Sequence, residues 1–349
     1  MLGARMPVIP SRVYLDVTNA CQLRCRHCCT SSGAPRADEL ELDEILSVVD
    51  QVRAMGVERL VISGGEPLRR PGLATILEHA RSLGLQVTLL TNGLLIDEDW
   101  TQRLVALQVR VKISLDGATA ATHDFLRGKG AFERTCAVLR GLSAAGAPDL
   151  TVHYTVHRKN LAELSSLPDL LSRLGVKNVV IGTIKPSGRA RSNHQLLIPP
   201  HMIPYVQQRV RAIQRHAGIT LCQLQDRGWE GFGCPATCNK LGLTASGRLT
   251  TCAFFGQEYL GGSIRQHSLE TLWRDHLTRG DMFVANASCA SCPSLARCGG
   301  GCRARALYYQ GDINATDPHC CAFSNKQAFL DSHSPQLEAA RQGDLGAFL

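Results

Sequence analysis

The chain has 349 residues, of which 44% are hydrophobic and 19% charged, a composition typical of folded globular proteins. No stretch approaches the roughly 18 uninterrupted apolar residues of a membrane span, and the first residues lack the apolar core of a signal peptide, so we expect a cytoplasmic protein. In such a reducing compartment, the 15 cysteines argue against a disulfide scaffold and for metal or redox sites.

The first two-thirds of the chain alternates short β-rich runs with amphipathic helical segments, which predicts βα units on a mainly parallel sheet. We predict strands at 12–17, 58–63, 86–90, 110–115, 150–156 and 178–184. Right-handed crossovers between six such strands predict an α/β fold, a partial (β/α)6 barrel. Ligands in these folds bind at the carboxyl ends of the strands, so the segments that follow the strands are the place to search for a site.

Polar and glycine-rich segments do follow the predicted strands. They are a cysteine run at 21–29, the GGEP sequence at 64–67, TNG at 91–93, the Asp116-Gly117 pair, HRKN at 157–160 and KPSGRA at 185–190. In the last of these, Lys185, Arg189 and Arg191 are candidates to bind a carboxylate or phosphate of a substrate, with a solvated basic loop as the alternative.

Cys21, Cys25 and Cys28 form a C-x3-C-x2-C pattern directly after the first strand. A [4Fe–4S] cube is held by cysteine thiolates, and three ligands leave one iron open to another molecule. Zinc more often takes four ligands in C-x2-C pairs. The spacing therefore favours an iron–sulfur cluster with an open iron.

This triplet, together with Ser63-Gly64-Gly65-Glu66-Pro67 after the second strand, resembles the radical S-adenosylmethionine (SAM) superfamily. The resemblance implies that the open iron chelates SAM. It also implies that an electron from the reduced cluster cleaves SAM to methionine and a 5′-deoxyadenosyl radical, which abstracts hydrogen from a substrate. Cys29 would then not be a ligand, because a fourth thiolate would occupy the iron that SAM needs.

The same resemblance implies a set of SAM contacts. Gly64, Gly65 and Glu66 would hold the methionine amino group, since a carboxylate pairs with an ammonium. Ser114 and Asp116 would lie near the ribose. Arg127 would pair with the SAM carboxylate, with a solvated arginine as the alternative. Asn92 would face SAM or the substrate, although strand-end turns favour Asn-Gly for conformational reasons as well.

A second array of cysteines, from Cys234 to Cys320, resembles the SPASM extension of radical SAM enzymes, which carries two auxiliary [4Fe–4S] clusters. The resemblance implies three clusters in all. By position, the first auxiliary cluster would take Cys234, Cys238, Cys252 and Cys302, and the second would take Cys289, Cys292, Cys298 and Cys320. A zinc ribbon is the alternative to the two clusters, and Cys321 is the alternative to Cys320 as the last ligand. Cys136 and Cys222 are expected to be ordinary thiols.

We therefore predict a radical SAM partial barrel at 1–200, a connecting helical segment at 201–232, a SPASM domain at 233–325 and a C-terminal helix or tail at 326–349. The formal charge of +8 counts every cysteine as neutral, so it largely offsets the iron–sulfur sites. It gives no argument for nucleic acid or a membrane as a partner.

The resemblance extends to peptide maturases of the mycofactocin and pyrroloquinoline-quinone type, through SLDGATAATHDFLRGKGAF and KPSGRA. It implies oxidation, crosslinking or decarboxylation of a ribosomal peptide, with a flavodoxin- or ferredoxin-like electron donor. Only 11 residues precede the first strand, so a peptide would need a separate carrier protein. The alternatives are a small-molecule substrate, such as a sugar, nucleoside or tetrapyrrole, and a non-catalytic iron–sulfur protein.

One position departs from a related pattern. Sulfatase-maturing members follow their equivalent of Cys252 with an aspartate that serves as base, whereas Ala253 stands here. This departure argues against formylglycine formation, and it leaves no general base assigned.

Overall fold

The computed structural model describes residues 9–224, 240–279, 289, 292 and 300–321. Ten strands form one sheet in the order β10-β9-β8-β1-β2-β3-β4-β5-β6-β7. Its parallel strands are β1 (Arg12–Asp16), β2 (Arg59–Ser63), β3 (Gln86–Thr91), β4 (Arg110–Ser114), β5 (Thr151–Val156), β6 (Asn178–Thr183), β7 (Thr220–Leu224) and β8 (Lys240–Leu243). β9 (Arg248–Thr250) and β10 (Leu260–Ser263) continue antiparallel.

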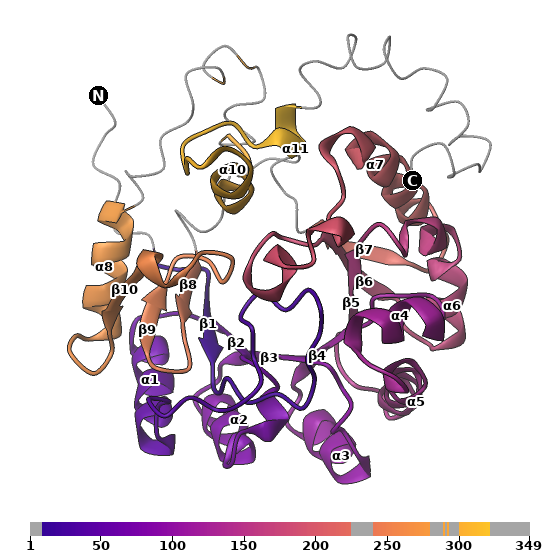
Figure 1. Ribbon diagram of the computed structural model, residues 1–349. Coiled ribbons are helices and arrows are strands. Elements are labelled where there is room, and N and C mark those ends of the chain that lie inside the picture. Colours follow the sequence, from indigo (N-terminus) through magenta and orange to yellow (C-terminus); the bar gives the residue numbers. More distant parts are fainter. Residues whose placement is uncertain (1–8, 225–239, 280–288, 290–291, 293–299, 322–349) are drawn as a thin grey trace.

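Helices run along the outer side of the curved sheet (Figure 1). In the parallel part they are α1 (Leu42–Ala54), α2 (Leu73–Ser82), α3 (Glu98–Ala106), α4 (Ala120–Arg127), α5 (Ala131–Ala144), α6 (Leu167–Arg173) and α7 (Ile203–Gln214). Later in the chain come α8 (Leu269–Arg279), α10 (Arg303–Gln310) and α11 (Pro318–Cys321). No helix in the described ranges is long and apolar enough to cross a membrane.

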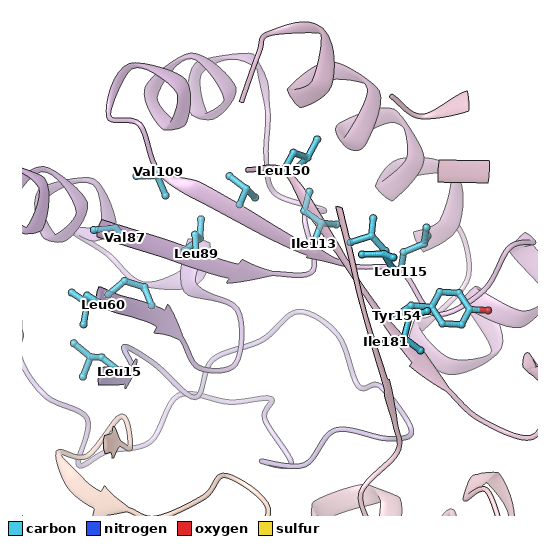
Figure 2. Packing of buried hydrophobic residues seen from close by; sticks show 14 of the residues in the cluster. Leu15, Leu60, Val87, Leu89, Val109, Ile113, Leu115, Leu150, Tyr154 and Ile181 are labelled. Carbon is cyan, nitrogen blue, oxygen red and sulfur yellow. The ribbon is translucent and has the colours of Figure 1, made fainter. Parts of the chain in front are cut away.

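The main core lies between the sheet and these helices. In β1, β3 and β4, buried residues alternate with half-buried ones, as expected for strands with two different faces. Leu15, Leu60, Leu89 and Ile113 are fully buried on the helix side (Figure 2). The alternate residues therefore point to the inner side of the sheet, which is free to carry polar groups.

The α/β fold and the six predicted strands are confirmed, with ends that differ by one residue or none. α7 lies in the segment predicted to be a helical connection, but β7 in the same segment was not predicted. Its sequence, TLCQL, has little β-branched character, and its pairing with β6 breaks register between Val179 and Val180. The boundaries of the four predicted domains stay a prediction.

Candidate functional site

A cavity of about 340 Å³ opens at the carboxyl ends of the parallel strands. Cys21, Cys25 and Cys28, which follow β1, all line it. Ser63, Gly64 and Gly65 line it from the end of β2, and Ser114 from the end of β4. The structure thus brings together the cysteine motif and the glycine motif that the sequence analysis singled out.

The two glycines let the loop after β2 pack directly against the cysteine loop. The backbone N–H of Gly65 donates to the Thr18 carbonyl at 2.7 Å, and the N–H of Glu66 donates to the Ala20 carbonyl at 2.8 Å. A Cβ at Gly64 would overlap the Thr18 carbonyl oxygen, and one at Gly65 would overlap that of Ala20. Glycine is therefore required at both positions by the chain itself.

Glu66 is completely buried, and it accepts three hydrogen bonds. The Leu68 N–H donates at 3.1 Å, the Thr91 hydroxyl at 2.7 Å and the Asn92 N–H at 2.8 Å. Burial nevertheless raises the pKa of the carboxyl group, although these donors oppose the shift. These contacts give Glu66 a role in positioning the loops after β2 and β3, and its contact with a SAM amino group stays a prediction.

The thiols of the motif differ in their surroundings. Burial opposes ionisation of Cys28, but the Thr30 hydroxyl, the Ser32 N–H and the charge of Arg189 favour it, so the pKa of the Cys28 thiol is lowered. Burial raises the pKa of Cys21 to about 11 and also raises that of Cys25. Coordination to a metal ionises a thiol even where burial opposes it.

Two guanidinium groups near Cys25 offset the negative charge that thiolates bring, because Arg127 and Arg189 both act on its pKa. Across the described ranges, no three His, Cys, Asp or Glu side chains converge as the ligands of a single ion would. A cubane takes its thiolates on separate irons. Three thiols that face one pocket beside two cations are suited to hold such a cluster, and the assignment of the metal stays a prediction.

Arg127 and Asp116 form a buried ion pair at the edge of the pocket. Arg127 Nε donates to Asp116 Oδ2 at 2.6 Å, and the side-chain exposures are 9% and 0%. Burial opposes ionisation of Asp116, but the positive charge of Arg127 outweighs burial and holds the pKa of Asp116 far below the usual range. Burial lowers the pKa of His27 to about 3, so this neighbour is neutral at pH 7.

Of the predicted SAM contacts, Arg127, Ser114 and Asn92 line the pocket together with Gly64 and Gly65. Asn92 Oδ1 accepts from Gln22 Nε2 at 3.1 Å and from the Leu94 N–H at 3.0 Å, which fits the conformational role of an Asn-Gly turn. Asp116 lies behind Arg127 and also accepts the Thr155 N–H at 2.9 Å. Its approach to a ribose stays a prediction, and the geometry gives it the role of orienting Arg127.

The segment after β6 holds the cysteine loop from the other side, which the sequence analysis missed. Arg189 donates from Nε to the Cys25 carbonyl at 2.8 Å and from Nη1 to the Ser32 carbonyl at 2.8 Å. The Arg189 N–H donates to the Cys28 carbonyl at 3.0 Å. The run KPSGRA marked the segment as polar, but nothing in its pattern indicated a contact with a loop about 160 residues away.

The auxiliary cysteines are described only in part. Cys234, Cys238 and Cys298 lie outside the described residues, and Cys320 lies in α11 with its side chain undescribed. Cys252 lines the pocket. Burial is the main cause that raises the pKa of Cys302, and the charge of Cys252 adds to it, so these two thiols are neighbours. Cys29 also lines the pocket, and burial, followed by the charges of Cys28, Asp16 and Cys252, raises the pKa of its thiol.

Asp317 holds the backbone around Cys302 and Cys320. Its carboxylate is completely buried and bidentate with Arg305, at 2.8 and 2.6 Å. The same two oxygens accept the Cys302 N–H at 2.6 Å and the His319 N–H at 3.0 Å. One carboxylate thus fixes the start of α10, directly after Cys302, and the start of α11, which contains Cys320.

Residues 15–187 match the model of the radical SAM superfamily. The chain is 29% identical to the AdoMet-dependent heme synthase of Methanosarcina barkeri, over 89% of this chain and 96% of that protein. It is 29% identical to the PqqA peptide cyclase of Rhizobium meliloti, over 89% and 87%. It is 28% identical to the mycofactocin maturase MftC of Mycobacterium tuberculosis, over 93% and 86%.

Among solved structures, Streptococcus suis SuiB bound to the precursor peptide SuiA superposes with a TM-score of 0.74. The superposition covers 88% of this chain and 75% of SuiB, at 18% identity. This likeness confirms the partial-barrel fold.

Proposed function

We propose that this chain, which belongs to the radical SAM superfamily, modifies a ribosomal peptide by oxidation, crosslinking or decarboxylation. The observation that carries the proposal is the pocket that Cys21, Cys25 and Cys28 share with Gly64 and Gly65. Superfamily members bind a [4Fe–4S] cluster and SAM, and the bound pair supplies a 5′-deoxyadenosyl radical that abstracts hydrogen from a substrate. The chain is thus an enzyme.

The chain's own residues prepare the pocket for these groups. Cys21, Cys25 and Cys28 would hold the cluster, with Arg127 and Arg189 offsetting the thiolate charge. Gly64 and Gly65 present backbone at the pocket wall, Ser114 offers a hydroxyl, and Arg127 offers a guanidinium for a carboxylate. Glu66 and Asp116 would act behind them, by fixing the loops and Arg127.

A peptide as the substrate is supported by two relatives named for such work, the PqqA peptide cyclase and the mycofactocin maturase. Both align over most of their length with this chain. We further propose that two auxiliary [4Fe–4S] clusters use the two sets of four cysteines given above. A flavodoxin- or ferredoxin-like donor and a separate peptide carrier in a reducing cytoplasm would complete the system.

A second candidate substrate is a tetrapyrrole, because the heme synthase is 29% identical over 96% of its own length. The pocket chemistry described above suits either substrate, since the cysteine and glycine motifs act on SAM. The two candidates differ in which molecule is consumed, so they separate in one assay.

The test is SAM cleavage by the anaerobically reconstituted protein, first without substrate and then with each candidate. We expect 5′-deoxyadenosine from the wild type and none from Cys21→Ala, whereas Cys222→Ser, a thiol outside the proposed ligand sets, keeps the activity. A change in mass of a short peptide encoded beside the gene supports peptide modification. Consumption of an added iron porphyrin precursor instead supports the tetrapyrrole. Absence of 5′-deoxyadenosine from the wild type contradicts both.

A further inference from the structure

Asp16 places a carboxyl group on the pocket wall. In β1, Val13 and Leu15 are completely buried in the core, so Tyr14 and Asp16 lie on the opposite face of the strand. Both line the pocket. Among the described residues that line it, Asp16 is the only Asp or Glu.

The neighbours of Asp16 suit a carboxyl group that exchanges a proton. Asp16 stands opposite Ser63 in the β1–β2 register, and the Ser63 side chain hydrogen-bonds to it. Burial raises the pKa of Asp16 to about 6, against this hydrogen bond. A group poised near neutrality can both accept and release a proton at physiological pH. The other titratable or charged groups on this pocket are Tyr14, Cys21, Cys25, His27, Cys28, Cys29, Arg127, His153, Lys185, Arg189, Lys240 and Cys252.

The residue after Cys252 is Ala253, which cannot serve as a base, whereas Asp16 offers a carboxyl group on the same pocket. Ala253 follows Cys252, lines the same pocket and carries no ionisable group. Asp16 reaches the pocket from β1. The charges of Asp16 and of Cys252 both act on the pKa of the Cys29 thiol, after burial and Cys28. The carboxyl group therefore lies on the side of the pocket where Cys252 lies.

We propose that Asp16 is the general base that takes a proton from the substrate during its oxidation, an inference that rests on the proposed function. Oxidation removes two hydrogens from a substrate C–H and a neighbouring ionisable X–H. One hydrogen leaves as an atom to the radical derived from SAM. The proton of X–H passes to the Asp16 carboxylate, and the remaining electron needs an acceptor, which an iron–sulfur cluster held by the cysteine-rich region would supply. The substrate gains one bond between C and X, so atoms and electrons balance.

The first experiment compares wild type, Asp16→Asn and Asp16→Glu with the peptide whose mass the wild type changes. Asparagine has the same size but cannot take the proton. We expect the ratio of modified peptide to 5′-deoxyadenosine to fall about 100-fold or more in Asp16→Asn. Asp16→Glu should recover part of the yield with a shifted pH profile. Asp99→Asn, an exposed change in α3, is the matched control. An unchanged ratio in Asp16→Asn overturns the inference.

A second measurement decides the case where no peptide is modified, an outcome that by itself counts against the proposed function only. Infrared difference spectra of wild type minus Asp16→Asn report the protonated carboxyl group directly. A carboxyl band that titrates near pH 6 supports the inference, and a group that stays ionised down to about pH 3 overturns it, because such a carboxylate is too weak a base to take the proton.

Discussion

Buried polar side chains around the pocket act in pairs, with one member at the pocket and one behind it. Arg127 lines the pocket while Asp116 holds it at 2.6 Å. Behind Asp116, His123 Nδ1 accepts the Asp116 N–H at 3.1 Å, so this ring must be neutral there. The surroundings of Asp116 and His123 thus set their protonation states in the folded protein, and these states can be measured.

His123 gives a prediction on pH. Burial lowers its pKa in the folded state to about 4, below the unfolded value of about 6.5. Below pH 6.5, His123 binds a proton in the unfolded chain but stays neutral in the folded chain. The part of the free energy of unfolding that this difference contributes above pH 6.5 is therefore lost as pH falls towards 4. Between pH 7 and pH 5, we expect the free energy of unfolding to fall by about 2 kcal/mol more in the wild type than in His123→Gln.

Urea unfolding at the two pH values measures this difference. Glutamine keeps an acceptor for the Asp116 N–H but does not titrate, so changes common to both proteins, including that of Asp16, cancel. His79→Gln, at a half-exposed residue on α2, serves as control. Equal pH slopes for the wild type and His123→Gln would show that His123 does not titrate as described.

At the scale of elements, the cysteine loop is positioned by the loops on either side of it. The loop after β2 contacts it through Gly64 and Gly65, and the segment after β6 contacts it through Gly188 and Arg189. Gly188 has φ +55°, and a Cβ there would overlap the Cys28 and Cys29 carbonyl oxygens. The geometry of the cysteines therefore depends on backbone contacts between distant loops.

Gly188→Ala should accordingly impair the cluster of the cysteine loop. Gly218→Ala is the matched control, because Gly218 has φ +83° but nothing within 4 Å of its Cβ position. Both changes cost about 1 kcal/mol of backbone strain. Only Gly188→Ala also displaces the carbonyls of the cysteine loop, so we expect it alone to lose SAM-responsive cluster signal in electron paramagnetic resonance. Equal signals in the two variants would contradict this role of Gly188.

The elements and the motifs were predictable because they are local. Alternation of apolar residues marks β1, β3 and β4, and the spacing of Cys21, Cys25 and Cys28 is visible in one short segment, although their role as cluster ligands stays a prediction. The functions of Glu66 and Arg189 were less visible, because their partners stand 25 and 164 residues away in the sequence. The order in which strands pair across the sheet brings these partners together, and a local sequence pattern does not predict that order.

At the scale of the whole molecule, the cysteine-rich region continues the barrel sheet. β8 pairs in parallel with β1, so β8 and β9 extend the sheet at the edge next to the cysteine loop. Cys252 follows β9 and thereby reaches the same pocket as Cys28. A redox group held by Cys252 would thus lie beside a substrate bound in the pocket.

This arrangement predicts the iron content of the protein. Three cubanes give about twelve irons per chain after anaerobic reconstitution. Asp317→Asn removes the carboxylate charge that neutralises the buried Arg305 guanidinium and that accepts the Cys302 and His319 N–H groups, so the backbone that carries the proposed ligands Cys302 and Cys320 loses its anchor. We expect this variant to retain about eight irons or fewer.

Asp312→Asn is the control for that measurement, because Asp312 is exposed and, in the bonds described, its carboxylate accepts only the nearby Asn314 N–H. A SAM-responsive signal that persists in Asp317→Asn would show that the barrel is still folded and that the loss is confined to the auxiliary region. About twelve irons in Asp317→Asn would mean that the Arg305–Asp317 pair does not position cluster ligands. About four irons in the wild type would mean that only Cys21, Cys25 and Cys28 hold a cluster, and the electron accepted from the substrate would then have to leave through a partner protein.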